Sequence, residues 1–170
     1  MLNSEFLIVQ KEGLFLPNKA LLGLLQEVLS KGNSLRLRVK GFSMFPCIRN
    51  NDIVTVSPLN GFLSHTGLAV AFIHPYTNKL VIHRVIRQNK YGVVTKGDCS
   101  FSIDGLVPHK NILGIVTKIE RNNRGIHFGI MYGRSLALFL NKTNIFALFF
   151  HLGMHLPRFI RRVIKRALFR

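Results

Sequence analysis

The chain has 170 residues and a formal net charge of +17, from 24 Lys and Arg against 7 Asp and Glu. A chain of this length can bury a core without disulfides or a structural metal, so we expect one globular unit with an extension. Its two cysteines, Cys47 and Cys99, lack CxxC spacing, which argues against both a disulfide framework and a zinc ribbon. The positive charge indicates a polyanionic partner, either nucleic acid or the anionic face of a membrane.

Residues 1–34 are predicted to form a helical lead-in. The stretch "NKALLGLLQEVLSK" (residues 18–31) follows Pro17 and precedes Gly32, and its leucines recur at helical spacing. Charged residues interrupt every apolar run near the N-terminus, so no secretory signal is expected.

Residues 35–120 are predicted to form a compact, mostly antiparallel β domain, which makes the fold class mainly β (α+β). In "LRLRV" (residues 35–39) apolar and basic residues alternate with the period of a strand. Short turns separate the other expected strands, and no long helical pattern lies between them. These strands are expected at residues 53–56, 68–73, 79–87, 92–96 and 112–120.

Residues 121–170 form a basic, apolar tail with ten Lys or Arg and no acid. Its apolar part, residues 135–156, is interrupted by "NKTN" at 141–144, so it lacks the roughly 20 uninterrupted apolar residues that a transmembrane helix needs. The last part, "PRFIRRVIKRALFR" (residues 157–170), places its apolar and basic residues on opposite sides of a helix. This pattern is typical of a helix that lies in a lipid interface, so we expect peripheral attachment to an anionic membrane and an otherwise cytoplasmic protein.

Ser43 lies in "KGFSMFPCIRNNDIVTV", between two phenylalanines and before an alternating apolar stretch. A serine hydroxyl becomes a useful nucleophile only when a base removes its proton, and histidine is the best-suited base near neutral pH. Among the seven histidines, His83 lies in the most strand-like run, "LVIHRVI", on the same face as Val81 and Val85. Singly, such residues are more often a core histidine and a turn serine than catalytic groups.

Several motifs occur together in a fixed order: "GFSMFP", "NDIVTV", "VIHRVI", "TKGDCS" and "SIDG". In order and approximate spacing they resemble the catalytic domain of type I signal peptidases and of the related LexA-type peptidases. The resemblance covers about residues 35–120. His83 stands where the common bacterial signal peptidases have lysine, which resembles the branch of archaea, the endoplasmic reticulum and some sporulating bacteria.

The resemblance implies that Ser43 is the nucleophile and His83 the general base. Asp98 and Asp104 match the two acids of the histidine branch, and Asp98 is the preferred candidate for orienting the imidazole, with Asp104 second. The implied reaction is acyl transfer through an acyl-enzyme, without cofactor or metal. The substrate would be a precursor protein or peptide that loses a leader or signal peptide.

The chain departs from the family pattern at three points. Asn51 replaces the glycine of the usual Gly-Asp box, which a turn tolerates because asparagine accepts left-handed backbone geometry. Cys47 occupies a position where the family often has a small hydroxyl or apolar residue. No N-terminal membrane anchor of the housekeeping type is recognisable in residues 1–34.

Other functions remain open. The chain can serve a single modified or secreted peptide as a dedicated leader peptidase, or it can be a peptidase fold that has lost catalysis and binds membrane or nucleic acid. Nucleic acid is the less favoured partner, because a helix-turn-helix has no room before residue 35 and the basic tail is interleaved with Phe, Leu and Ile. His151 and His155 have the spacing of a zinc pair, but "HLGMH" lacks the glutamate of a zincin, so no metal site is expected.

Overall fold

A computed structural model describes residues 7–9, 18–59, 66–126, 139, 143, 144 and 148. The predicted basic helix at 157–170 and the histidines at 151 and 155 lie outside these residues. Among the described residues, none of the helices has the length and hydropathy that crossing a bilayer requires.

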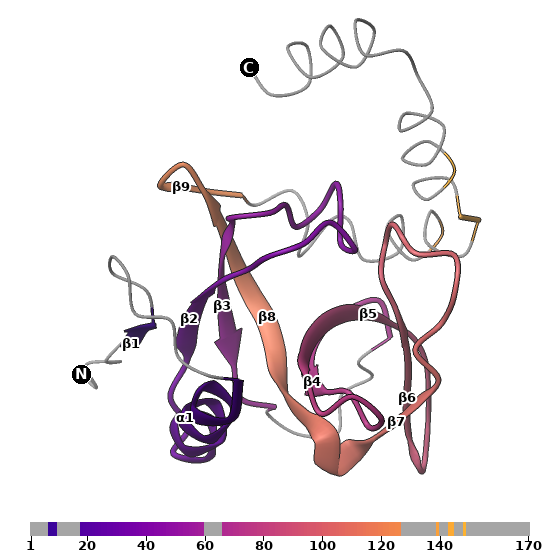
Figure 1. Cartoon of the computed structure of the whole chain (residues 1–170), viewed down its shortest axis with the longest axis horizontal. Helices are drawn as coiled ribbons and strands as arrows, with labels where there is room; N and C mark the ends of the chain where they lie inside the picture. The colour runs from indigo at the N-terminus through magenta and orange to yellow at the C-terminus, as the bar shows by residue number, and fades with distance from the viewer. Residues whose placement is uncertain are drawn as a thin grey trace, which may run out of the picture.

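The described part of the chain is dominated by one strongly curved sheet (Figure 1). Its strands follow the order β1-β2-β3-β8-β4-β5-β6-β7, and β9 pairs with β8. All pairings are antiparallel except that of β1 with β2, which is parallel. The strands are β1 (Leu7–Val9), β2 (Leu35–Arg38), β3 (Ile53–Ser57), β4 (Ala69–Ile73), β5 (Leu80–Asn89), β6 (Gly92–Lys96), β7 (Leu106–Pro108), β8 (Ile112–Arg121) and β9 (Arg124–Gly125).

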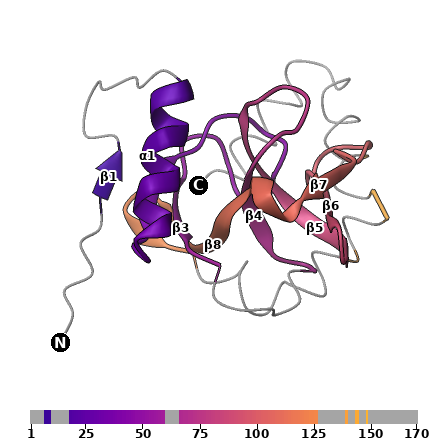
Figure 2. The ribbon, with the colours of Figure 1, turned by 90° about the horizontal axis from the view of Figure 1, so that it is seen from below.

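Helix α1 (Asn18–Ser30) lies beside the first strands (Figure 2) and buries its apolar side in the core. Leu25 and Val28 pack in one cluster with residues of β2 and β3, including Leu35 and Val54. The helix ends at a glycine with φ +81°, Gly32, whose N–H bonds to the carbonyl of Leu29. Only a residue without Cβ takes this conformation cheaply, so the helix ends where the sequence predicts.

Strand β8 joins the two halves of the sheet. It pairs with β3 on one side and with β4 on the other, and it crosses between them in Figure 1. A second apolar cluster lies in the half formed by β4 to β7 and includes Val70, Phe72, Val85 and Val93. The β3–β8 and β4–β8 registers each shift by a bulge, which adds to the local twist and curvature.

The prediction of a mainly β, largely antiparallel fold with one N-terminal helix is confirmed. The predicted N-terminal helix and the strands predicted within residues 35–120 are all present, with ends that differ by a few residues. Strands β1, β7 and β9 were not predicted, because segments of two or three residues are too short to show a period. The 3₁₀ turn at His109–Asn111 was not predicted either.

Candidate active site

Ser43 lies on an exposed turn between β2 and β3. Two helical-type bonds shape the turn, from the N–H of Phe45 to the carbonyl of Phe42 and from the N–H of Ile48 to the carbonyl of Met44. The Phe45–Pro46 peptide bond is cis. Met44 and Ile48 are each 4% exposed and pack into the core under the turn, so Ser43 is presented on a rigid support.

The acidic box that follows Ser43 closes the base of this turn. The Asp52 carboxylate, 3% exposed, accepts bonds from the Arg121 guanidinium at 2.9 and 2.7 Å and from the N–H of Arg49 at 2.7 Å. Asn51 has φ +71°, which is the left-handed geometry expected for the residue that replaces glycine. Asp52 is therefore a structural residue that ties the turn to β8.

His83, on β5, reaches both the serine and an acid. Its Nε2 lies 2.9 Å from the Oγ of Ser43, and its Nδ1 lies 2.7 Å from the Oδ2 of Asp104. The His83 and Asp104 side chains are only 12% and 14% exposed. Phe72 lies on the neighbouring strand, with its ring centroid 6.3 Å from that of His83.

The acid fixes the tautomer of the imidazole. An ionised carboxylate can only accept hydrogen bonds, so the proton of a neutral His83 must be on Nδ1, facing Asp104. The lone pair of Nε2 then faces the Ser43 hydroxyl and can take its proton. The three side chains thus form a continuous hydrogen-bonded series of hydroxyl, imidazole and carboxylate, as in a serine hydrolase triad.

Asp98 has a different partner. Its two carboxylate oxygens accept from Nε and Nη2 of Arg84, each at 2.7 Å, and the two side chains are 0% and 4% exposed. The third guanidinium nitrogen, Nη1, donates to the carbonyl of Gly67 at 2.7 Å. Arg84 follows His83 directly on β5, so it points to the opposite face of the strand. The expectation that Asp98 orients the imidazole is therefore wrong, and Asp104, the second candidate, contacts His83.

Gly97 allows the loop after β6 to pack directly against the Ser43 turn. The N–H of Cys99 donates to the carbonyl of Ser43 at 2.7 Å. A Cβ added at Gly97 would lie 2.7 Å from the same carbonyl oxygen and 3.1 Å from the Ser43 Cβ, closer than packed atoms allow. The absence of a side chain at Gly97 thus lets this loop pack directly against the Ser43 turn.

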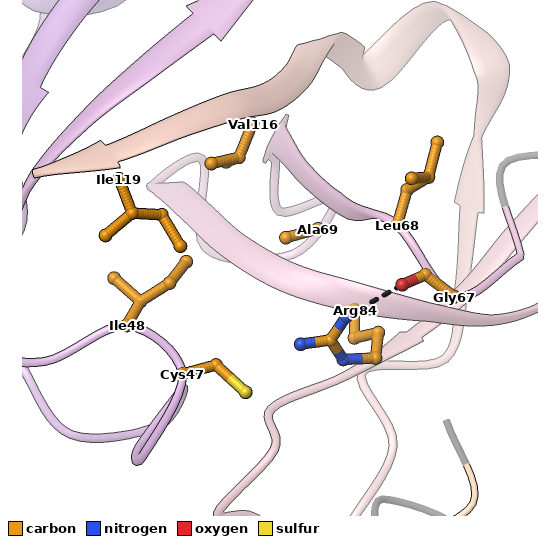
Figure 3. Close-up of a pocket in the computed structure, with 8 residues that line it drawn as sticks. All are labelled: Cys47, Ile48, Gly67, Leu68, Ala69, Arg84, Val116 and Ile119. Atoms are coloured by element: carbon orange, nitrogen blue, oxygen red, sulfur yellow. Dashed lines mark hydrogen bonds between the residues drawn. The ribbon is translucent and has the colours of Figure 1, made fainter. Parts of the chain in front are cut away.

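A small pocket lies on the Arg84 side of β5 (Figure 3). Ile48 and Val116 line it, together with Cys47 and Arg84. Because His83 points to the other face of β5, neither Ser43 nor His83 lines this pocket. Burial, and then the charge of Asp98, raise the pKa of the Cys47 thiol to about 11, and the same two causes raise that of Cys99 to about 11.

Sequence reasoning did not identify Arg84 or Thr95 as parts of this region. Arg84 carries a signal that could have been used, since a charged residue within the apolar run "VIHRVI" needs a buried partner of opposite charge. Thr95 carries no such signal in the sequence, because threonine is a common residue in strands. Within the described residues, no group of three His, Cys, Asp or Glu could hold a metal ion.

The comparisons with known proteins add no family. The chain matches no protein-family model, and no curated protein matches it.

Proposed function

We propose that the protein is a serine endopeptidase resembling the type I signal peptidases, which removes a leader or signal peptide from a precursor. The observation that carries this proposal is the hydrogen-bonded series of Ser43, His83 and Asp104, with the serine exposed and the two other groups largely buried. The family motifs in the sequence, found in the same three places, support it independently.

In the proposed mechanism, the Oγ of Ser43 attacks the scissile carbonyl carbon while Nε2 of His83 takes the hydroxyl proton. The imidazolium then gives this proton to the leaving amine as the C–N bond breaks, which leaves an ester on Ser43. Water attacks the ester, loses a proton to the same nitrogen, and releases the new carboxyl end as Ser43 regains its proton. Asp104 stabilises the imidazolium at each stage, and the backbone N–H of Ser43 is the simplest donor to the oxyanion.

The sheet offers a place for an extended peptide beside the base. Strand β5 pairs with β4 over residues 80–84, but β6 pairs with β5 only from Arg84 onward. Within the described part of the chain, no strand pairs with the other edge of β5 before Arg84. A precursor segment that adds to this edge as a strand would run toward His83 and Ser43, with its peptide groups held by backbone bonds.

The other functions differ from this one in client or in chemistry. A dedicated leader peptidase would use the same three residues on one peptide. A non-catalytic module would have no need for a serine, an imidazole and a carboxylate at bonding distance, so the geometry favours an enzyme. The proposed membrane attachment through residues 157–170 depends on the sequence pattern alone.

The test compares protein N-termini in cells that express wild type, Ser43→Ala or His83→Ala at matched levels. New N-termini that occur only with wild type would support the proposal, and the residues before each cut would give the specificity. One client would indicate a dedicated leader peptidase, and many clients would indicate general export. Identical N-termini in all three strains, with secreted precursors present, would contradict peptidase activity.

A further inference from the structure

The acid of the site comes from a segment without regular secondary structure. Asp104 lies between β6 and β7, in the loop that begins at Gly97. A carboxylate on such a loop has no periodic backbone to hold it against the imidazole. Something else must fix its position.

Thr95, in β6, holds Asp104 at two points. The N–H of Asp104 donates to the carbonyl of Thr95 at 2.9 Å, and the Thr95 hydroxyl donates to the Oδ2 of Asp104 at 2.8 Å. This carboxylate oxygen is the one that accepts from Nδ1 of His83. Thr95 is 0% exposed, so water does not compete for its hydroxyl.

The sheet places Thr95 and His83 on one face. Thr95 is paired with Val85 across the β5–β6 ladder, and Val85 is two residues beyond His83. Paired residues share a face, and residues two apart on a strand share it too. The Thr95 hydroxyl on β6 and the His83 imidazole on β5 therefore lie on neighbouring, hydrogen-bonded strands. Both contact the Oδ2 of Asp104.

We propose that Thr95 is a positioning residue, whose hydroxyl holds Asp104 in the orientation that keeps the Nδ1 proton of His83 in place. Its role rests on the proposed peptidase mechanism, but its effect on the imidazole can be measured without any substrate. The hydroxyl, and not the methyl group, carries this role.

The test uses two substitutions of opposite kind. Thr95→Val keeps the shape and removes the hydroxyl, and Thr95→Ser keeps the hydroxyl and removes the methyl. The control is Thr55→Val, the same change at a buried threonine of β3.

The first readout is the NMR signal of the His83 Nδ1 proton in ¹⁵N-labelled protein, assigned by its loss in His83→Ala. The second is the rate at which an alkyl fluorophosphonate labels Ser43.

In Thr95→Val we expect the Nδ1 proton to exchange rapidly and broaden, and labelling to slow by about tenfold, as the loss of one bond to a charged group implies. Thr95→Ser should resemble wild type in both readouts, as should the control. A sharp, protected Nδ1 proton in Thr95→Val would overturn the proposal, and so would a loss in Thr95→Ser that equals the loss in Thr95→Val.

Two further results have separate meanings. If Thr95→Val does not fold, Thr95→Ala is compared with Thr95→Ser, since both lack the methyl group and only one has the hydroxyl. If wild type is neither labelled nor active on precursors, the peptidase function fails. The proton signal still decides whether Thr95 holds Asp104 on His83.

Discussion

Asp98 and Asp104 belong to one loop, but they bind side chains on opposite faces of β5. Asp104 binds the largely buried imidazole of His83, and Asp98 forms a fully buried ion pair with Arg84. We therefore expect Asp104 to contribute to the proposed catalysis and Asp98 to contribute to stability. Substitutions of the two residues should have different effects.

Asp104→Asn should lower activity by roughly four orders of magnitude, because an amide no longer fixes the tautomer or stabilises the imidazolium. Its melting temperature should stay close to that of wild type. Asp98→Asn should lower the unfolding free energy by about 3–5 kcal/mol, because Arg84 is left buried without its counter-charge. Activity assays and chemical denaturation of both variants check this, and equal effects on stability would contradict it.

The histidine base predicts a pH dependence. The rate should fall as the pH is lowered into the acid range, because a protonated Nε2 cannot accept from the Ser43 hydroxyl. A profile of kcat/KM against pH tests this. A rate that stays constant down to acid pH would exclude a histidine base.

The two thiols should be unreactive near neutral pH. Burial, followed by the charge of Asp98, raises the pKa of Cys47 and of Cys99 from 9.0 to about 11, so thiolate is scarce at pH 8. We expect slow alkylation of the folded protein by iodoacetamide, with a steep increase only above about pH 10, and rapid alkylation in denaturant. Rapid labelling of either thiol in the folded state at pH 8 would contradict these environments.

At the residue level, the sequence motifs predicted that Ser43 and His83 belong to one site, and the structure places the two side chains at bonding distance. The motifs did not identify the acid that contacts His83. Both residues stand in recognisable motifs, and strand alternation places His83 on a defined face. The segment from Gly97 to Gly105 has no such period, so nothing in its pattern shows that Asp98 turns to one face of β5 and Asp104 to the other.

Among the elements, the contact between the loop after β6 and the Ser43 turn is the most sensitive to a single atom. Gly97→Ala places a Cβ 2.7 Å from the Ser43 carbonyl oxygen, so loop and turn must separate. We expect activity to fall by at least an order of magnitude, as a misplaced nucleophile implies. Gly23→Ala, in α1 with no atom within 4 Å of the added Cβ, should instead stabilise the fold by about 0.5–1 kcal/mol.

Assays of both glycine variants beside thermal melts test this contact. Full activity in Gly97→Ala would show that the loop and turn can move apart without effect.

The long strands were predictable because each has several alternating residues. The contact of Gly97 with Ser43 was not, since it joins segments more than fifty residues apart.

For the molecule as a whole, the distribution of charge is the feature to test. Residues 157–170 hold six of the ten basic residues of the tail. We expect the full chain to float with vesicles that contain anionic lipid, and to be released by salt because the attraction is screened. Deletion of 157–170 should abolish flotation while activity on a soluble peptide remains. Unchanged flotation would show that these residues do not bind the membrane.

The place of β8 between β3 and β4 has a consequence for when activity arises during synthesis. Ser43 precedes β3, whereas His83 and Asp104 belong to the half of the sheet that begins at β4. The strand that pairs with both halves, β8, follows all of these residues in the chain. A nascent chain shorter than about 112 residues therefore lacks the strand that brings nucleophile and base together. On the proposed mechanism, the newly made protein would be inert toward its neighbours until β8 joins the two halves of the sheet, and a reactive serine would report that they have joined.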